Sequence, residues 1–360
     1  MKKVLIVQAF IPHYRVPFFE KLHEVLMEEN VDLRLVYGQQ SGIDKYREFN
    51  ARRDLTFGTR RRNFWFFRGR VLLQPALREI MLADLVIVEQ ANKHLLNYML
   101  ILLSRLGIKR IAFWGHGLNR QRRDPNSFSE KVKAWLVRYP DWWFAYTPSV
   151  AKYLKSRGVK AQVITVVQNS VDVRHFQNLL AEISNQDLEL ARADLGIQPG
   201  SKVGLFCGRL TRDKKLPFLM RAAREIRERV PDFHLVIIGE GPERKVVEAF
   251  AAGEDWVHCV GARLGREKAL YFKLAHVFLN PGMIGLGILD AFAGGLPVIT
   301  TDIDTHSPEI DYLEDGYSGI MCRSISPTLC VDFFILHVYI VPFYRNRNRQ
   351  TPCHTCFVGI

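Results

Sequence analysis

The chain has 360 residues, of which 48% are hydrophobic and 24% are charged. This is the composition of a globular protein with enough residues for two domains, and it excludes disordered and collagen-like chains. All six cysteines lie after residue 200 at irregular spacings, which excludes a disulfide scaffold and indicates reduced thiols in a cytosolic protein. The formal net charge is +13: residues 1–180 hold 30 Lys and Arg against 15 Asp and Glu, and residues 181–360 hold 20 against 22. The basic first half predicts contact with anionic material.

Strands and helices are predicted to alternate in the first half of the chain. The apolar run at residues 4–7 ends at Gln8 with no small-residue cleavage site after it, so we expect a buried strand and no signal peptide. Further strands are predicted at 33–36, 85–88 and 111–113, and helices at 18–29, 95–106 and 130–138. This alternation is typical of βαβ units and predicts a parallel sheet.

The same alternation restarts after Pro199-Gly200 and continues to residue 300. Strands are predicted at 204–206, 235–238, 257–260, 277–279 and 298–300, and helices at 216–229, 243–250, 266–273 and 286–293. We therefore predict an α/β protein with two doubly wound domains and no membrane span. Its parts are a first domain at residues 1–175, a linker at 176–200, a second domain at 201–322 and an atypical tail at 323–360.

Two loops in the second domain have the composition of an anion site. Arg209 and Lys214 follow the strand at 204–206, where their charges suit a diphosphate; a solvated basic loop is the alternative. Gly285 and Gly287 follow the strand at 277–279, and Asp290 lies one turn into the next helix, within reach of ribose hydroxyls. Glycines let backbone N–H groups approach an anion, although a plain tight turn is the alternative reading.

Together these stretches resemble the family-4 glycosyltransferases of the GT-B fold. The matching pieces are 208–210 with Lys214, then 237–243, 260–261 and 285–299, with weaker support from 168–172. The resemblance implies two Rossmann-like domains that face each other across a cleft. It also implies a retaining transfer of a hexose from a nucleotide sugar that is bound mainly by the second domain, without a metal or another cofactor.

The resemblance also assigns roles to residues of the second domain. Arg209 and Lys214 match the family's diphosphate-binding pair, with a catalytic role. The donor-binding positions are Gly239, Gly241, Gly261, Gly285, Gly287 and Asp290. The family usually carries two glutamates with seven residues between them, but here Gly282 stands at the first position and Asp290 at the second. The identity of the donor sugar is therefore left open.

Residues of the first domain complete the predicted site. His116 follows the strand at 111–113 and matches in position a catalytic histidine that the family places over the donor sugar; a purely structural histidine is the alternative. The residues after the first strand, His13, Tyr14 and Arg15, are predicted on the acceptor side.

Residues 45–70 form a stretch that is rich in arginine and aromatic residues and contains only two acidic residues. Arginine binds lipid phosphates and aromatic rings prefer the membrane interface, so Arg60, Arg61, Arg62 and Trp65 are predicted to contact an anionic membrane surface. The alternative is a solvated loop whose aromatic side chains lie in the core.

The expected function is therefore a hexosyltransferase of cell-surface polysaccharide synthesis, cytoplasmic and peripheral on the inner face of the membrane. Its expected partners are a nucleotide-sugar donor, a glycan or lipid-linked acceptor and the anionic membrane, with no nucleic acid. A nucleotide-sugar epimerase of the same fold and a basic nucleic-acid-binding protein remain as alternatives. The Asp302-Ile303-Asp304 motif and the Cys353-His354-Thr355-Cys356 motif are interpreted as chance, so no metal is predicted. The tail after residue 322 matches nothing in the family, and we expect it to impair activity.

Overall fold

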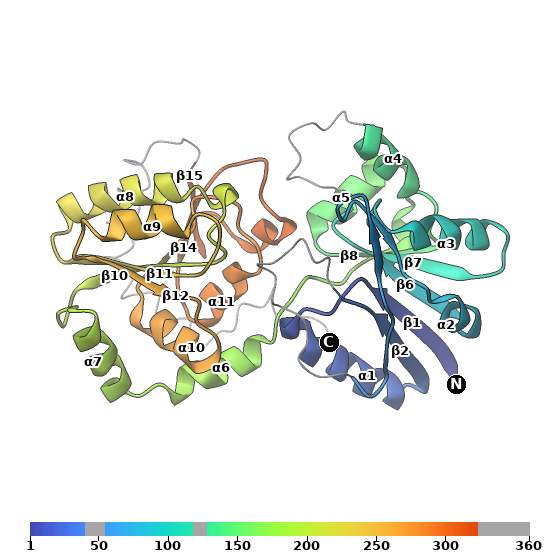
Figure 1. Ribbon diagram of the computed structural model, residues 1–360, viewed down its shortest axis with the longest axis horizontal. Coiled ribbons are helices and arrows are strands. Elements are labelled where there is room, and N and C mark those ends of the chain that lie inside the picture. The colour runs from blue at the N-terminus through green and yellow to red at the C-terminus, as the bar shows by residue number, and fades with distance from the viewer. Residues whose placement is uncertain (40–54, 118–127, 323–360) are drawn as a thin grey trace. The chain divides into compact units, whose positions relative to one another are not determined.

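The computed structural model describes residues 1–39, 55–117 and 128–322, and the chain divides into two units (Figure 1). The first unit is Met1–Asp172, and the second begins at Val173. Each unit is built on its own parallel sheet, as the alternation of predicted strands and helices requires.

The sheet of the first unit has seven parallel strands in the order β3-β2-β1-β6-β7-β8-β9. They are β1 (Lys2–Gln8), β2 (Val31–Tyr37), β3 (Gly58–Arg60), β6 (Leu85–Glu89), β7 (Arg110–Gly115), β8 (Trp142–Ala145) and β9 (Ile164–Val166). A separate antiparallel hairpin consists of β4 (Phe64–Phe66) and β5 (Val71–Leu73). The helical elements are η1 (His13–Arg15), α1 (Val16–Glu28), α2 (Leu77–Leu82), α3 (Leu95–Arg105), α4 (Phe128–Leu136), α5 (Pro148–Ser156) and η2 (Ala161–Val163).

Both faces of this sheet are covered. Successive side chains of a strand point to opposite faces, so Ile6 joins a core with Phe19 of α1, whereas Leu5 joins a different core with Leu100 of α3 and Leu154 of α5. The near-continuous apolar strands of the sequence follow from this double coverage.

The sheet of the second unit has six parallel strands in the order β12-β11-β10-β13-β14-β15. They are β10 (Lys202–Cys207), β11 (Phe233–Ile238), β12 (Val257–Gly261), β13 (Val277–Leu279), β14 (Val298–Thr301) and β15 (Gly319–Cys322). The helical elements are α6 (Val173–Glu182), α7 (Asn185–Asp194), η3 (Arg212–Lys214), α8 (Leu216–Arg229), α9 (Arg244–Ala251), α10 (Gly265–Leu274), α11 (Gly287–Ala293) and η4 (Pro308–Tyr312).

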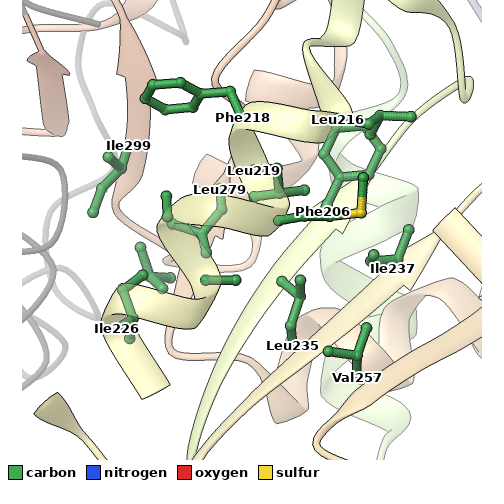
Figure 2. Close-up of a cluster of buried hydrophobic side chains, with 14 of the residues drawn as sticks. Phe206, Leu216, Phe218, Leu219, Ile226, Leu235, Ile237, Val257, Leu279 and Ile299 are labelled. Carbon is green, nitrogen blue, oxygen red and sulfur yellow. The ribbon is translucent and has the colours of Figure 1, made fainter. Parts of the chain in front are cut away.

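Helices α8 and α9 lie on one face of this second sheet, and α10 and α11 lie on the other (Figure 1). Figure 2 shows the core under α8, where Phe218, Leu219 and Ile226 pack against side chains of the strands such as Leu235 and Leu279. These residues are at most 5% exposed, so the core fixes the strand ends from which the site loops leave.

The region predicted as a linker, 176–200, contains most of α6 and all of α7, and it lies in the second unit. Its second helix has a capping box, because Ser184 and Asp187 satisfy each other's backbone N–H groups. The predicted tail at 323–360 lies outside the described residues. Among the described residues, none of the helices is both long enough and apolar enough to cross a membrane.

Candidate functional site

The strand order of the second sheet reverses between the neighbours β10 and β13. Open α/β sheets bind ligands beyond the carboxyl ends of their strands at such a reversal. The two loops that the sequence singled out, residues 208–215 and 280–286, leave these two strand ends. The topology therefore brings the basic loop and the glycine loop side by side.

The two loops are locked together by hydrogen bonds. The amide of Met283 donates to the carbonyl of Asp213 at 2.9 Å, and the Lys214 ammonium donates to the carbonyl of Met283. The Lys214 side chain also lies 3.9 Å from the sulfur of Met283. The ammonium of Lys214 thus crosses from the basic loop to the backbone of the glycine loop.

Gly282 makes this crossing possible. A Cβ atom at this position would lie 2.3 Å from the carbonyl oxygen of Asp213 and 2.3 Å from the carbonyl carbon of Lys214, so no side chain fits without a backbone shift. A glutamate, which the resemblance leads one to expect at this position, would therefore not fit in this arrangement of the two loops. The neighbouring glycines differ, because a Cβ atom at Gly285 or Gly287 would come no closer than 3.9 and 3.6 Å to any heavy atom.

Among the described residues neither Arg209 nor Lys214 has a carboxylate within ion-pair distance, although the charges of Asp213 and Glu309 act on the Lys214 ammonium. Within the same described parts of the chain, the buried Nε atom of Arg209 has no hydrogen-bond partner. Lys214 is only 8% exposed, and burial lowers the pKa of its ammonium. Two poorly compensated cations at the switch point are suited to an anionic group of a ligand.

The predicted glycines after β11 and β12 bring a third loop against the basic loop. The amide of Gly208 donates to Ile238 O at 3.0 Å, and the amide of Gly239 donates to Gly261 O at 2.9 Å. A Cβ atom at Gly239 would lie 1.9 Å from Gly208 O, and one at Gly241 would lie 2.3 Å from Leu210 O. These two glycines permit close backbone packing, whereas Gly261 has a φ of +71°.

Asp290 lies in the first turn of α11, where Lys268 of α10 donates to its Oδ2 atom at 2.9 Å. Burial raises the pKa of the Asp290 carboxyl, and the charge of Lys268 opposes that shift. The neighbouring thiol of Cys207 is neutral at physiological pH, because burial raises its pKa to about 12. Lys268, which the sequence analysis did not single out, is thus the ionic partner of the predicted ribose-binding carboxylate.

In the first unit, Tyr146 brings two predicted residues together. Arg15 donates to the Tyr146 hydroxyl at 2.7 Å, and the His116 ring meets the Tyr146 ring edge to face at 4.6 Å between centroids. Arg15 also donates to Asn169 Oδ1 at 3.1 Å. His116 follows β7, is exposed and lies between two glycines of positive φ. The other two acceptor-side residues lie beside Arg15 on η1: His13 is half-buried and Tyr14 is 36% exposed.

Glu89, the last residue of β6, supplies a half-buried negative charge close to Arg15. Although burial by itself raises the pKa of this carboxyl, the charges of His94, Lys93, Arg15 and His116 lower it overall. The lowered pKa favours the ionised form of Glu89, whose charge supports the guanidinium of the predicted residue Arg15.

The predicted membrane residues divide into two groups. Arg60 and Arg62 are exposed, whereas Arg61 pairs with Glu79 of α2 through its guanidinium. Trp65 is half-buried: its indole N–H donates to Gln39 O at 3.3 Å, and the Lys93 ammonium lies 5.5 Å from its ring centre. Arg61 and Trp65 are thus engaged within the unit.

Residues 201–331 match the family described as "Glycosyl transferases group 1". Among curated proteins, alpha-monoglucosyldiacylglycerol synthase of Acholeplasma laidlawii is 25% identical over 162 residues. That match covers 43% of this chain and 39% of the relative, so the chain matches well under half of the relative's length.

Two solved structures are similar over nearly the whole chain. HepE of Anabaena in complex with UDP has a TM-score of 0.66 at 15% identity, covering 93% of this chain and 90% of that chain. The UDP-GlcNAc 2-epimerase of Methanocaldococcus jannaschii has a TM-score of 0.59 at 17% identity, covering 94% of this chain and 93% of that one. At these identities the likeness concerns the fold, and it confirms the predicted α/β fold class.

Proposed function

We propose that this chain, whose residues 201–331 carry a group 1 glycosyl transferase domain on the GT-B fold that its motifs predicted, transfers a hexose from a nucleotide sugar to an acceptor. The observation that supports this most is the pair Arg209 and Lys214, two cations that form no ion pair among the described residues, at the switch point of the second sheet. A leaving diphosphate supplies negative charge that can pair with both cations.

The donor is proposed to bind along the three loops of the second unit. Arg209 and Lys214 hold the diphosphate, and the absence of side chains at Gly285 and Gly287 lets the phosphate oxygens approach the backbone. Asp290 accepts hydrogen bonds from ribose hydroxyls. A structure of similar fold contains UDP, so uridine is the first base to test.

Catalysis in this proposal is electrostatic. The two cations stabilise the charge that develops on the departing diphosphate, so no metal ion is needed for that purpose. His116, exposed at the end of β7, is proposed to contact the transferred sugar, and the anomeric configuration is retained. Within the described residues, no cluster of three or more His, Cys, Asp or Glu side chains is arranged to hold a metal ion.

The acceptor is proposed to be a glycan or a lipid-linked glycan of cell-surface polysaccharide synthesis, met at the inner face of the membrane. A relative that matches part of the chain is named for making a glucosylated diacylglycerol, which is a lipid. The exposed arginines 60 and 62 of the basic first half support contact with an anionic surface.

A nucleotide-sugar epimerase also has this fold, so the test must separate the two reactions. The chain is first screened by thermal shift against UDP, GDP and ADP; a ligand at 100 times its Kd adds about 2.7 kcal/mol of stability. The matching nucleotide sugars are then incubated with the protein and a membrane lipid extract. Release of the nucleoside diphosphate together with a labelled lipid or glycan supports transfer, whereas an epimerised nucleotide sugar, or no nucleotide binding, contradicts it.

A further inference from the structure

The hairpin of β4 and β5 has an apolar outer side. Its cross-strand pairs are Phe64 with Leu73, Trp65 with Leu72, and Phe66 with Val71. Alternation puts the first and third pairs on one side, where Phe64, Phe66 and Leu73 are 40%, 46% and 43% exposed, while Leu72 on the other side is 1% exposed. A hairpin that only meets water normally carries polar residues on its outer side.

The inner side of the hairpin is anchored to the first unit. The buried Asn63 side chain donates to Ala9 O and to Gln39 O, at 2.6 and 2.8 Å. The amide of Leu72 donates to Lys93 O at 2.7 Å. Because the inner side is fixed at both strands, the apolar outer side is held toward the outside of the unit.

The turn of the hairpin places a phenylalanine where its backbone is unfavourable. Phe67, Arg68 and Gly69 have φ values of 50°, 54° and 79°, and Phe67 is 77% exposed. Glycine or asparagine adopts this left-handed conformation readily, whereas a bulky side chain is rare there. A strained, exposed aromatic residue at the tip indicates a function other than folding.

Arginines surround these apolar side chains. Residues 55–78 contain six arginines and no Asp or Glu. Arg60, Arg62, Arg68 and Arg70 are exposed, and the guanidinium of Arg62 lies 5.5 Å from the ring centre of Phe64. The exposed apolar side chains suit the boundary of the acyl chains in an anionic bilayer. The guanidinium groups around them suit the lipid phosphates.

We propose that residues 64–73 form a membrane-insertion hairpin, in which Phe67 and the outer side enter the interface of an anionic bilayer and the surrounding arginines bind lipid phosphates. This deepens the membrane association proposed above and shifts its centre from Arg61 and Trp65, which are engaged within the unit, to the hairpin tip. The occupant is lipid because the exposed apolar residues occur together with the exposed arginines Arg60, Arg62, Arg68 and Arg70.

The test uses sedimentation of the full chain with vesicles made of equal parts of phosphatidylglycerol and phosphatidylcholine. Phe67→Asn is expected to lower the partition coefficient roughly tenfold, since a buried phenylalanine ring is lost from the interface. Leu264→Asn, at a residue that is 58% exposed in the second unit, is the matched control and should leave binding unchanged. Because asparagine suits positive φ, the melting temperature of Phe67→Asn should equal or exceed that of the wild type.

Variants of the arginines test whether the occupant of the hairpin surface is an anionic lipid. Arg68→Gln with Arg70→Gln should abolish the preference for phosphatidylglycerol over pure phosphatidylcholine, while Arg221→Gln, at an exposed arginine of α8, should keep it. Unchanged vesicle binding in Phe67→Asn and in the double arginine variant would overturn the proposal. So would a change in oligomeric state without a change in vesicle binding, which would assign the hairpin to a second copy of the chain. UDP binding is measured on the same samples, so failure of the donor site is seen separately.

Discussion

The ammonium of Lys268 donates to the carboxylate of Asp290 at 2.9 Å, and aromatic rings flank the same ammonium. Its nitrogen lies 4.5 Å from the ring centre of Phe176 and 5.8 Å from that of Phe272. These contacts restrain a flexible side chain on α10 so that it meets a carboxylate on α11. The charge of the lysine therefore opposes the effect of burial, which alone would favour the protonated acid, and its hydrogen bond orients the Asp290 carboxyl group.

We expect Lys268→Met to weaken UDP binding about tenfold near neutral pH, because a hydrogen-bonded charge partner typically contributes about 1.5–3 kcal/mol. The loss should grow as the pH falls, since the pKa of Asp290 rises further without the lysine and the protonated acid is a poorer acceptor. Titration calorimetry between about pH 5 and 8 measures this, with Lys268→Arg as the conservative control. A variant whose affinity is lower by the same factor at every pH would limit the lysine to a packing role.

Removal of either cation at the switch point should slow turnover by roughly two to three orders of magnitude without unfolding the chain. The variants are Arg209→Ala and Lys214→Met, and the control is Arg212→Ala, an exposed cation of the same loop. The rate of nucleotide release from the true donor is the measurement. Near-normal rates in both variants would remove this loop from the active site.

Gly282→Ala and Gly285→Ala are expected to behave differently although they lie three residues apart. The added methyl group at 282 meets the backbone of Asp213 and Lys214, so we expect a loss of about 2–3 kcal/mol of unfolding free energy. The methyl group at 285 has room, so stability should change by less than about 0.5 kcal/mol, while UDP affinity falls if phosphate approaches there. Urea unfolding measures the stability of both variants, and calorimetry measures the UDP affinity of Gly285→Ala. Equal stabilities of the two variants would contradict the steric account.

Two histidines meet between β11 and β12, where His234 Nδ1 lies 3.0 Å from His258 Nε2. Burial lowers both pKa values, and the charge of His234 adds to this effect at His258, whose pKa falls to about 4. Arg227 also lowers the pKa of His234, whereas Asp232 and Asp255 oppose the shift. The folded state therefore holds the pair neutral under conditions in which an unfolded chain would protonate it.

This pair predicts acid sensitivity of the fold. Its stabilisation is complete above the unfolded pKa of about 6.5 and is lost as the pH falls from there toward about 4, because only the unfolded state gains protons in that interval. After allowance for solvent screening, we expect the loss from His258 to be about 1–2 kcal/mol. Urea unfolding at several pH values compares the wild type with His258→Gln; an equally steep pH dependence in the variant would exclude the pair as its source.

The secondary structure was predicted best where apolar runs are long. The helix predicted at 95–106 corresponds to α3 (Leu95–Arg105), and the helix predicted at 216–229 has the bounds of α8. Strands β8 and β9 were not predicted, because strands of four and three residues give too few positions for a periodic signal. The hairpin of β4 and β5 was treated as a basic loop for the same reason.

The candidate site was predictable where it is local in sequence. Arg209 and Lys214 lie on one strand-to-helix connection, so their proximity followed from the predicted elements. The contact of Lys214 with Met283 spans 69 residues, and that of Arg15 with Tyr146 spans 131. Such contacts depend on which strands become neighbours in a sheet, and a single sequence without a strand order does not specify this.

The hydrogen bond from Lys214 to the carbonyl of Met283 has an entropic consequence for ligand binding. A solvent-exposed lysine loses up to about 2 kcal/mol of rotamer freedom when a ligand immobilises it. Here the neighbouring loop has already confined the side chain, so that entropy was lost during folding and is not lost again when an anion arrives. An anion that binds this ammonium therefore contacts a charge that is already ordered. Its affinity is reduced less by the loss of side-chain entropy than it would be at a mobile lysine.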